Sequence, residues 1–139
     1  MTLPEKILIS ARGAIGIPFR HQGRSDNGLD CAGLVVRCAD SAGLDYFDQG
    51  DYPRRPGGSR LETALDAQPC LVRVQVSCAQ PGDVLLIRFM SDPQHLAIHA
   101  GSTMIHAWEK VGKVCEHSLD EWRSGKVVRA YRFKETSHE

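Results

Sequence analysis

The sequence predicts an α+β domain, with helices in its first half and an antiparallel sheet in its second half. Before residue 70, apolar residues recur at the 3.6-residue spacing of amphipathic helices. After residue 70, apolar residues alternate with polar ones or form short runs between turn residues, as they do in strands. A group of helices followed by a group of strands is typical of the α+β layout.

The first helix is expected over residues 2–15. Thr2 and Glu5 stand at the spacing of a capping box, in which the two side chains satisfy backbone N–H groups at the start of a helix. The apolar stripe of this helix comprises Ile7, Leu8, Ala11 and Ile15. A loop rich in glycine and polar residues follows over residues 16–29.

The second helix is expected to begin at Cys31. Asp30 is a suitable N-cap, and Gly43 stands where the helix would end. The side that we expect to be buried comprises Leu34, Val35, Cys38, Ala39 and Ala42. In the first turn, unpaired N–H groups and the helix dipole favour a thiolate, the reactive form, and lower the cysteine pKa below about 8.5. Cys31 is therefore a candidate nucleophile; the alternative is a small buried apolar residue.

The remaining elements follow from the same two periodicities. After a loop over residues 44–58, Ser59 and Glu62 repeat the capping-box spacing and open a short helix through Ala67. A single helical turn is expected at residues 118–122. Strands are expected over residues 72–76, 84–87, 95–100, 103–108, 113–117 and 127–133.

Composition bounds the class of protein. The 139 residues are enough for one domain, 1–139, and 42% hydrophobic with 24% charged residues is ordinary for a globular chain. Lys plus Arg equals Asp plus Glu, at 17 each, so we expect neither a nucleic-acid nor a membrane partner. The local cluster of Arg54, Arg55 and Arg60 is interpreted as a solvated loop.

Cysteine usage and the N-terminus suggest a reducing compartment. The first residues lack a basic segment followed by an apolar one, which predicts no export signal and a cytoplasmic location at synthesis. The five cysteines show no paired spacing, which favours free thiols over disulfides. Without a Cys-x-x-Cys pair, we expect no structural zinc site.

The histidines supply a base for the cysteine. If the hairpin closes on Ala100-Gly101, residues whose numbers sum to 201 face each other, which places His95 opposite His106. His95 would then be the base, and His106 would orient it. His99 is the rival base, on the same face but nearer the turn; otherwise His99 and His117 are interpreted as exposed strand histidines. A metal site formed by Cys31, His95 and His106 is a further alternative.

Several motifs in the same order resemble the NlpC-type papain-like cysteine peptidases. The central ones are Asp30-Cys31-x-Gly33-Leu34-Val35, Pro81-Gly82-Asp83, His95-Leu-Ala-Ile-His-Ala-Gly101 and Ile105-His106-Ala107. The segments Gly16-Ile-Pro-Phe19 and Arg129-Ala-Tyr-Arg-Phe133 extend the resemblance over nearly the whole chain.

The resemblance implies a papain-like α+β fold and a triad without metal or other cofactor. Carried over by position, Cys31 is the nucleophile, His95 the base and His106 the orienting residue. Enzymes of this type cut peptidoglycan stem peptides, typically at the γ-D-glutamyl–diaminopimelate bond. The segment Arg20-His21-Gln22-Gly23, the short chain and the missing export signal look most like the phage and prophage branch. This implies tail proteins as partners and a place in the virion tail.

Two positions depart from the family pattern beside the cysteine. Phe19 stands where the family usually has Tyr, and Ala32 stands where it commonly has Ser. With His21, which could supply a missing donor, and Asp30, these are the expected substrate-binding residues. Two alternative functions stay open: a thioester-forming acyltransferase of the same fold, and a structural phage tail-assembly protein with a vestigial site.

Overall fold

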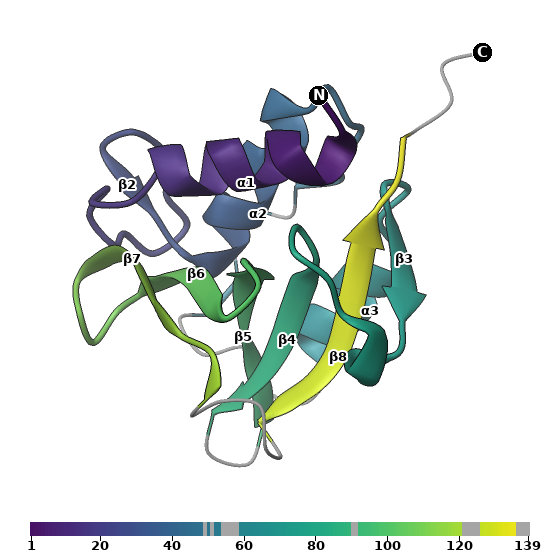
Figure 1. The fold of residues 1–139 in the computed structure, drawn as a ribbon. Coiled ribbons are helices and arrows are strands. Elements are labelled where there is room, and N and C mark those ends of the chain that lie inside the picture. Colours follow the sequence, from purple (N-terminus) through teal and green to yellow (C-terminus); the bar gives the residue numbers. More distant parts are fainter. Residues whose placement is uncertain (49, 51, 54–58, 90–91, 121–125, 136–139) are drawn as a thin grey trace.

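The computed structural model describes residues 1–139 apart from 49, 51, 54–58, 90–91, 121–125 and 136–139 (Figure 1). Its helices are α1 (Leu3–Gly13), α2 (Cys31–Ser41), α3 (Arg60–Asp66) and the 3₁₀ turn η1 (Val76–Cys78). Its strands are β1 (Arg24–Ser25), β2 (Gly28–Leu29), β3 (Leu71–Val74), β4 (Val84–Phe89), β5 (Asp92–His99), β6 (Thr103–Trp108), β7 (Lys113–Ser118) and β8 (Val127–Phe133). The α-helices precede the main sheet, so the α+β prediction is confirmed.

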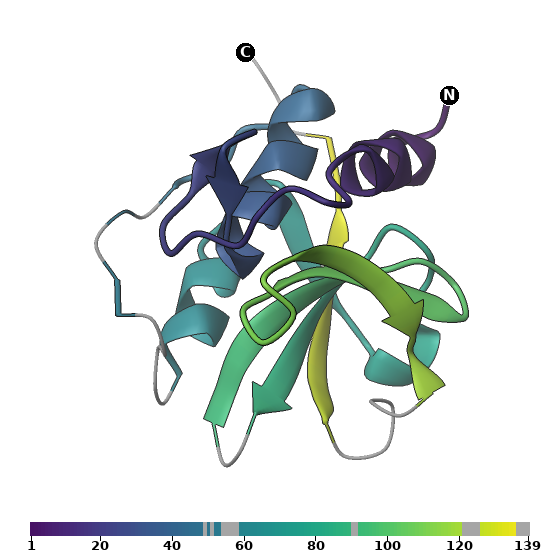
Figure 2. The same cartoon turned by 90° about the vertical axis from the view of Figure 1, so that its left-hand side faces the viewer.

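The main sheet has six strands in the order β3-β8-β4-β5-β6-β7, and every neighbouring pair is antiparallel. The three α-helices pack on one of its faces, with α1 and α2 lying against each other (Figures 1 and 2). The core between helices and sheet joins Ile7, Leu34 and Leu65 to Leu86 and Leu96. Burial of these large side chains is the main favourable term in folding.

A second apolar cluster covers the opposite face of the same sheet. It comprises Leu85, Ile87, Ala97, Met104, Leu119 and Ala130. The uninterrupted apolar run at residues 84–87 is explained by this arrangement, because successive side chains of β4 enter two different clusters. Among the described residues, no helix is long and apolar enough to cross a membrane.

The two long helices begin as the sequence predicts. Thr2 caps α1 and accepts a hydrogen bond from the N–H of Glu5, 3.3 Å away. Asp30 caps α2 and accepts from the N–H of Gly33 at 2.8 Å. The predicted apolar stripe of α1 is wrong at one position, because Ile15 lies beyond the helix end and is 44% exposed.

Two local predictions are wrong. The strand expected over residues 72–76 ends at Val74; Val72 and Val76 are exposed, and Val76 starts the 3₁₀ turn. The loop expected over residues 16–29 contains the hairpin β1–β2, which pairs Arg24 with Leu29. The helical turn predicted at residues 118–122 extends outside the described residues.

The register of the β5–β6 hairpin differs from the prediction by two residues. Ile98 pairs with Ile105 and His99 with Met104, so paired numbers sum to 203 rather than 201. The hairpin closes one residue later because Ala100 and Thr103 flank a turn at Gly101, which has a φ of 97°. A two-residue shift preserves the alternation of faces, so His95 and His106 still share one.

Candidate active site

Three histidines form a hydrogen-bonded chain across strands β5, β6 and β7. Nε2 of His95 lies 2.5 Å from Nδ1 of His106, and Nε2 of His106 lies 2.7 Å from Nε2 of His117. The predicted contact between His95 and His106 is therefore confirmed. The two residues are diagonal neighbours on adjacent strands, whereas the prediction placed them directly opposite each other. His117 is half-buried and is the third member of the chain, so the interpretation of it as an exposed strand histidine is wrong.

The far end of the chain fixes which nitrogens carry protons. Nδ1 of His117 lies 3.0 Å from the carbonyl oxygen of Ser118, which can only accept, so this Nδ1 carries a proton. With neutral rings, Nε2 of His117 then accepts from His106, and Nδ1 of His106 accepts from Nε2 of His95. In this arrangement the proton of His95 is on Nε2 and Nδ1 is unprotonated, so Nδ1 can act as a base.

Burial keeps the inner rings neutral. His106 is fully buried and His95 is 6% exposed. Desolvation, followed by repulsion from His117, lowers the pKa of His95 to about 3. Desolvation, with smaller effects of His95 and His117, lowers the pKa of His106 to about 2. At neutral pH, both rings therefore serve as hydrogen-bonding groups with defined tautomers.

His99, the rival base, takes part in the hairpin turn. It is buried, so its interpretation as an exposed strand histidine is also wrong. Its Nδ1 accepts a hydrogen bond from the N–H of Gly101 at 3.1 Å, and its backbone N–H bonds to the carbonyl of Asp83. These contacts hold the His99 ring at the turn, whereas His95 is hydrogen-bonded to His106.

Cys31 is the first residue of α2 and is half-buried. The backbone N–H groups of Leu96 and Ala32 act to lower the pKa of the Cys31 thiol, because they favour its thiolate form. The backbone N–H groups of successive residues in a strand point alternately to its two sides. The N–H of His99 bonds to Asp83 on the β4 side, so the N–H of Leu96, three residues earlier, points to the β6 side. Leu96 itself lies beyond the described residue pairs that join β5 to β6. The residue next to His95 in β5 therefore contributes to the electrostatic environment of Cys31.

The expected lowering of the Cys31 pKa is wrong. Desolvation, reinforced by the neighbouring Asp30 carboxylate, raises the pKa of the Cys31 thiol to about 12. The backbone N–H groups of Leu96 and Ala32 act in the opposite direction but are outweighed. The resting state is consequently a neutral thiol, although the position at a helix N-terminus is as predicted.

Asp30 holds the loop before α2 against the helix start. Its Oδ1 accepts from the N–H of Gly33 and from Nη1 of Arg24, and its Oδ2 accepts from the N–H of Gln22 and the hydroxyl of Tyr52. Gly33 permits this close approach, because a Cβ there would lie 2.2 Å from the carbonyl oxygen of Gly23. The structure thus shows Asp30 as a scaffold residue, and its binding of substrate stays a prediction.

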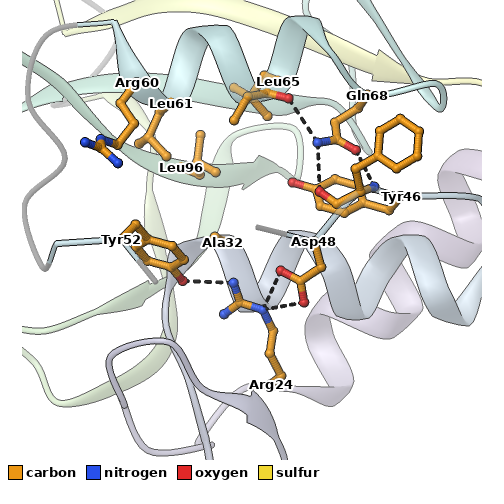
Figure 3. Close-up of a pocket in the computed structure, with 12 residues that line it drawn as sticks. Arg24, Ala32, Tyr46, Asp48, Tyr52, Arg60, Leu61, Leu65, Gln68 and Leu96 are labelled. Carbon is orange, nitrogen blue, oxygen red and sulfur yellow. Dashed lines mark hydrogen bonds and ion pairs between the residues drawn. The ribbon is translucent and has the colours of Figure 1, made fainter. Parts of the chain in front are cut away.

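A pocket lies beside this helix start (Figure 3). Arg24, Asp48 and Tyr52 form its polar wall: Nε of Arg24 lies 2.9 Å from Oδ2 of Asp48, and Nη2 of Arg24 donates to the hydroxyl of Tyr52. The apolar lining includes Ala32, Tyr46, Leu61, Leu65 and Leu96. Ala32, which follows Cys31 in α2, lines the pocket, so the pocket adjoins the residue that carries the thiol.

The polar wall of the pocket is the feature that sequence reasoning missed. Residues 44–58 are polar and rich in proline and glycine, which predicts an open loop, yet Tyr46, Asp48 and Tyr52 face the pocket. The only available signal was the presence of aromatic residues in such a segment. Arg60, assigned to a solvated cluster, lies at the pocket; Arg54 and Arg55 are outside the described residues.

The other predicted substrate-binding residues surround the same helix start. The ring of Phe19 packs against the core, and its N–H donates to the carbonyl of Gly112. The ring of His21 meets Tyr52 edge to face, with centroids 5.5 Å apart. Their contacts with substrate stay predictions, as does that of Ala32.

The metal site expected as an alternative, from Cys31, His95 and His106, is not found among the described residues. The three-residue cluster of potential ligands that is found there comprises His106, Cys115 and His117.

Comparison with known proteins identifies relatives over most of this chain. Residues 16–132 match the sequence profile described as the NlpC/P60 family. The chain is similar to probable endopeptidases of Mycobacterium bovis and Mycobacterium tuberculosis, with 32% identity over 102 residues. That match covers 73% of this chain and 22% of each relative, so the chain spans about a fifth of the relatives' length.

Solved structures show the same fold. The NlpC/p60 domain of the peptidoglycan hydrolase SagA superposes with a TM-score of 0.66 at 23% identity, over 91% of this chain and 96% of that one. The peptidoglycan hydrolase RipB of Mycobacterium tuberculosis gives a TM-score of 0.65 at 21% identity, over 98% of this chain and 66% of that one. The predicted papain-like α+β architecture is confirmed by these superpositions.

Proposed function

Because this chain belongs to the NlpC/P60 family, we propose that it is a cysteine peptidase that hydrolyses peptidoglycan stem peptides. The observation that carries the proposal is the hydrogen-bonded row of histidines, whose tautomers leave Nδ1 of His95 without a proton; the next residue of the strand, Leu96, favours the thiolate form of Cys31. The names of the relatives, endopeptidases and peptidoglycan hydrolases, support the reaction and the substrate class.

The reaction begins with a neutral pair. The Cys31 thiol passes its proton to Nδ1 of His95 as the sulfur attacks the scissile carbonyl carbon, forming the C–S bond. The resulting imidazolium donates through Nε2 to His106, which orients it and disperses its charge toward His117. His95 then protonates the departing amine, the C–N bond breaks, and a thioester remains on Cys31.

The start of α2 supplies the oxyanion donor. Two N–H groups of the first turns are already used, since Gly33 donates to Asp30 Oδ1 and Leu34 donates to the Asp30 carbonyl. The N–H of Cys31 precedes them and is the donor for the developing negative charge. Water, activated by His95, then hydrolyses the thioester and regenerates the thiol.

The pocket beside Ala32 is the proposed place for the stem peptide. Its polar wall of Arg24, Asp48 and Tyr52 offers both charges and a hydroxyl group, while Leu61 and Leu65 offer an apolar floor. This combination suits a short peptide that carries carboxylate and amine groups together with methyl and methylene groups. The bond proposed for cleavage is that between γ-D-glutamate and diaminopimelate.

Digestion of purified muropeptides by wild type, Cys31→Ala and Cys78→Ala tests the proposal. Cys78 is an exposed cysteine far from α2 in the sequence and serves as the matched control. Mass spectrometry of wild-type and Cys78→Ala digests should show two fragments whose masses sum to the substrate plus one water. Cys31→Ala should give neither fragment while keeping its circular-dichroism spectrum. Equal product from Cys31→Ala would contradict the proposal.

Two other functions are distinguishable from hydrolysis. An acyltransferase of the same fold would give wild-type products in which an added amine, rather than water, is joined to the new carbonyl. A structural tail protein with a vestigial site would give no product. The hydrogen-bonded row of His95, His106 and His117 favours an active enzyme. In a purely structural role, apolar side chains would stabilise the core as well as two buried imidazole rings with matched tautomers.

We also propose a place in a phage or prophage tail, with peptidoglycan contact on the host cell wall. The support for this is the sequence segment Arg20-His21-Gln22-Gly23, which resembles that branch of the family. Copurification of the chain with assembled tails, detected by mass spectrometry, tests it; absence of the chain from purified tails would contradict it.

A further inference from the structure

We propose that His106, Cys115 and His117 form a zinc site whose occupation switches the peptidase off. One nitrogen of each histidine and the Cys115 sulfur lie within 4.8 Å of one another. Zinc prefers such nitrogen and thiolate donors, at about 2.0–2.1 Å and about 2.3 Å respectively, with a tetrahedral arrangement. The proposal that zinc binds here is based on geometry alone. The proposal that zinc inhibits the peptidase rests on the proposed function.

The β6–β7 ladder gathers the three side chains on one face. Cys115 is directly opposite His106, and His117 is two residues further along the same strand. Directly opposed residues and residues two apart share a face, so their donor atoms point into one volume. Tetrahedral coordination requires donors roughly 3.3–3.7 Å apart. The histidine nitrogens, now 2.7 Å apart, must open slightly, and the sulfur must approach by about 1 Å.

His117 already has the proton arrangement of a metal ligand. Its Nδ1–H donates to the carbonyl of Ser118, so Nε2 is the unprotonated nitrogen; Nε2 now accepts from His106 and would exchange that hydrogen bond for the ion. Ligating histidines commonly donate their other N–H to a backbone carbonyl in this way. Cys115 and His117 are half-buried, so an ion from solvent reaches the outer two ligands before His106.

Zinc binding reverses the hydrogen bonds of the histidine chain. Cys115 releases its thiol proton to solvent as the S–Zn bond forms. Coordination through Nε2 of His106 requires that ring to carry its proton on Nδ1 instead. Nδ1–H of His106 then donates to Nε2 of His95, and the proton of His95 moves to its own Nδ1. Each inner ring keeps one proton, but His95 no longer has an acceptor nitrogen for the Cys31 proton.

Calorimetric titration with zinc under reducing conditions tests the site. Wild type, Cys31→Ala and Cys78→Ser should each bind one zinc ion per chain. Cys115→Ser and His117→Gln should weaken binding at least roughly tenfold. Cobalt(II) provides a second readout, since a sulfur-to-cobalt absorption band should appear in Cys31→Ala and be missing in Cys115→Ser. Retention of tight binding or of the band in Cys115→Ser would overturn the site.

The switch is tested with the muropeptide assay. Zinc should inhibit wild type and Cys78→Ser, and Cys115→Ser should keep its activity at zinc concentrations that inhibit wild type. Binding at Cys115 without inhibition would overturn the switch but not the site. If zinc binds as described and wild type cleaves no muropeptide even without zinc, the proposed function fails while the site stands. Zinc binding that is lost in Cys31→Ala would place the ion on the nucleophile and contradict the proposal.

Discussion

Mild acid should destabilise this protein more than its carboxylates alone would. His95 and His106 are buried with pKa values lowered to about 3 and about 2, while an unfolded histidine titrates near 6.5. Above pH 6.5 both states are neutral and the effect is absent. As pH falls below 6.5, the unfolded chain binds protons that the folded chain cannot, so the free energy of unfolding decreases.

The size of the effect follows from the lowered values. Each buried histidine lowers the free energy of unfolding by about 1.4 kcal/mol per pH unit below 6.5, which amounts to about 2 kcal/mol at pH 5. The two together remove about 4 kcal/mol between pH 7.5 and pH 5, a large part of the 5–15 kcal/mol of a typical domain. Ordinary carboxylates titrate mainly below pH 5, so this window isolates the histidines.

Urea denaturation at pH 7.5 and pH 5, followed by circular dichroism, measures the difference. Between pH 7.5 and pH 5, the free energy of unfolding of wild type should decrease by about 4 kcal/mol. That of His106→Gln should decrease by about half as much, because this variant has one buried imidazole fewer. Cys78→Ser, which leaves all the histidines in place, is the matched control and should lose as much as wild type. A wild-type loss below about 1 kcal/mol, or an undiminished loss in His106→Gln, would refute the reasoning.

Three further predictions concern the residues around the thiol. Asp30→Ala should lower the free energy of unfolding by roughly 2–4 kcal/mol in urea titrations, because the helix cap and the partner of Arg24 are lost together; a change below about 1 kcal/mol would contradict this. His117→Ala should reduce kcat roughly tenfold with KM unchanged, since it sets the tautomer of His106 without lining the pocket; an effect on KM alone would argue against it. Alkylation of Cys31 by iodoacetamide, mapped by mass spectrometry, should accelerate with pH through pH 9 without a plateau, whereas a plateau below pH 7 would indicate a resting thiolate.

Local patterns predicted the elements that local interactions determine. Thr2 and Asp30 cap the helices expected of them, because a cap bonds to N–H groups only three residues away. Val127–Phe133 was predicted with its observed bounds. The strand at Val72–Val76 was misjudged because alternation of valines does not distinguish a buried face from an exposed one at the sheet edge.

The sequence was sufficient to predict which histidines of the candidate site share a face of the sheet, but not how deeply the site is buried. Face alternation survives a two-residue error of register, so the contact of His95 with His106 was obtained from the sequence. The pKa of Cys31 depends on burial by segments distant in sequence and on Asp30, and its direction was therefore missed. His117 joins the chain only through the β6–β7 register, and Tyr52 reaches Asp30 from a loop without periodicity.

The most direct test of the account is to trap the thioester. Wild-type enzyme is mixed with a purified muropeptide, quenched in acid within the first turnover and digested for peptide mapping by mass spectrometry. We expect an acyl adduct on the peptide that contains Cys31, with a mass equal to the substrate minus its departing amine fragment, and no adduct in His95→Ala. Product formation without any adduct at Cys31, or an adduct on Cys115 or Cys78 instead, would contradict the assignment of Cys31 and His95 as the reacting pair.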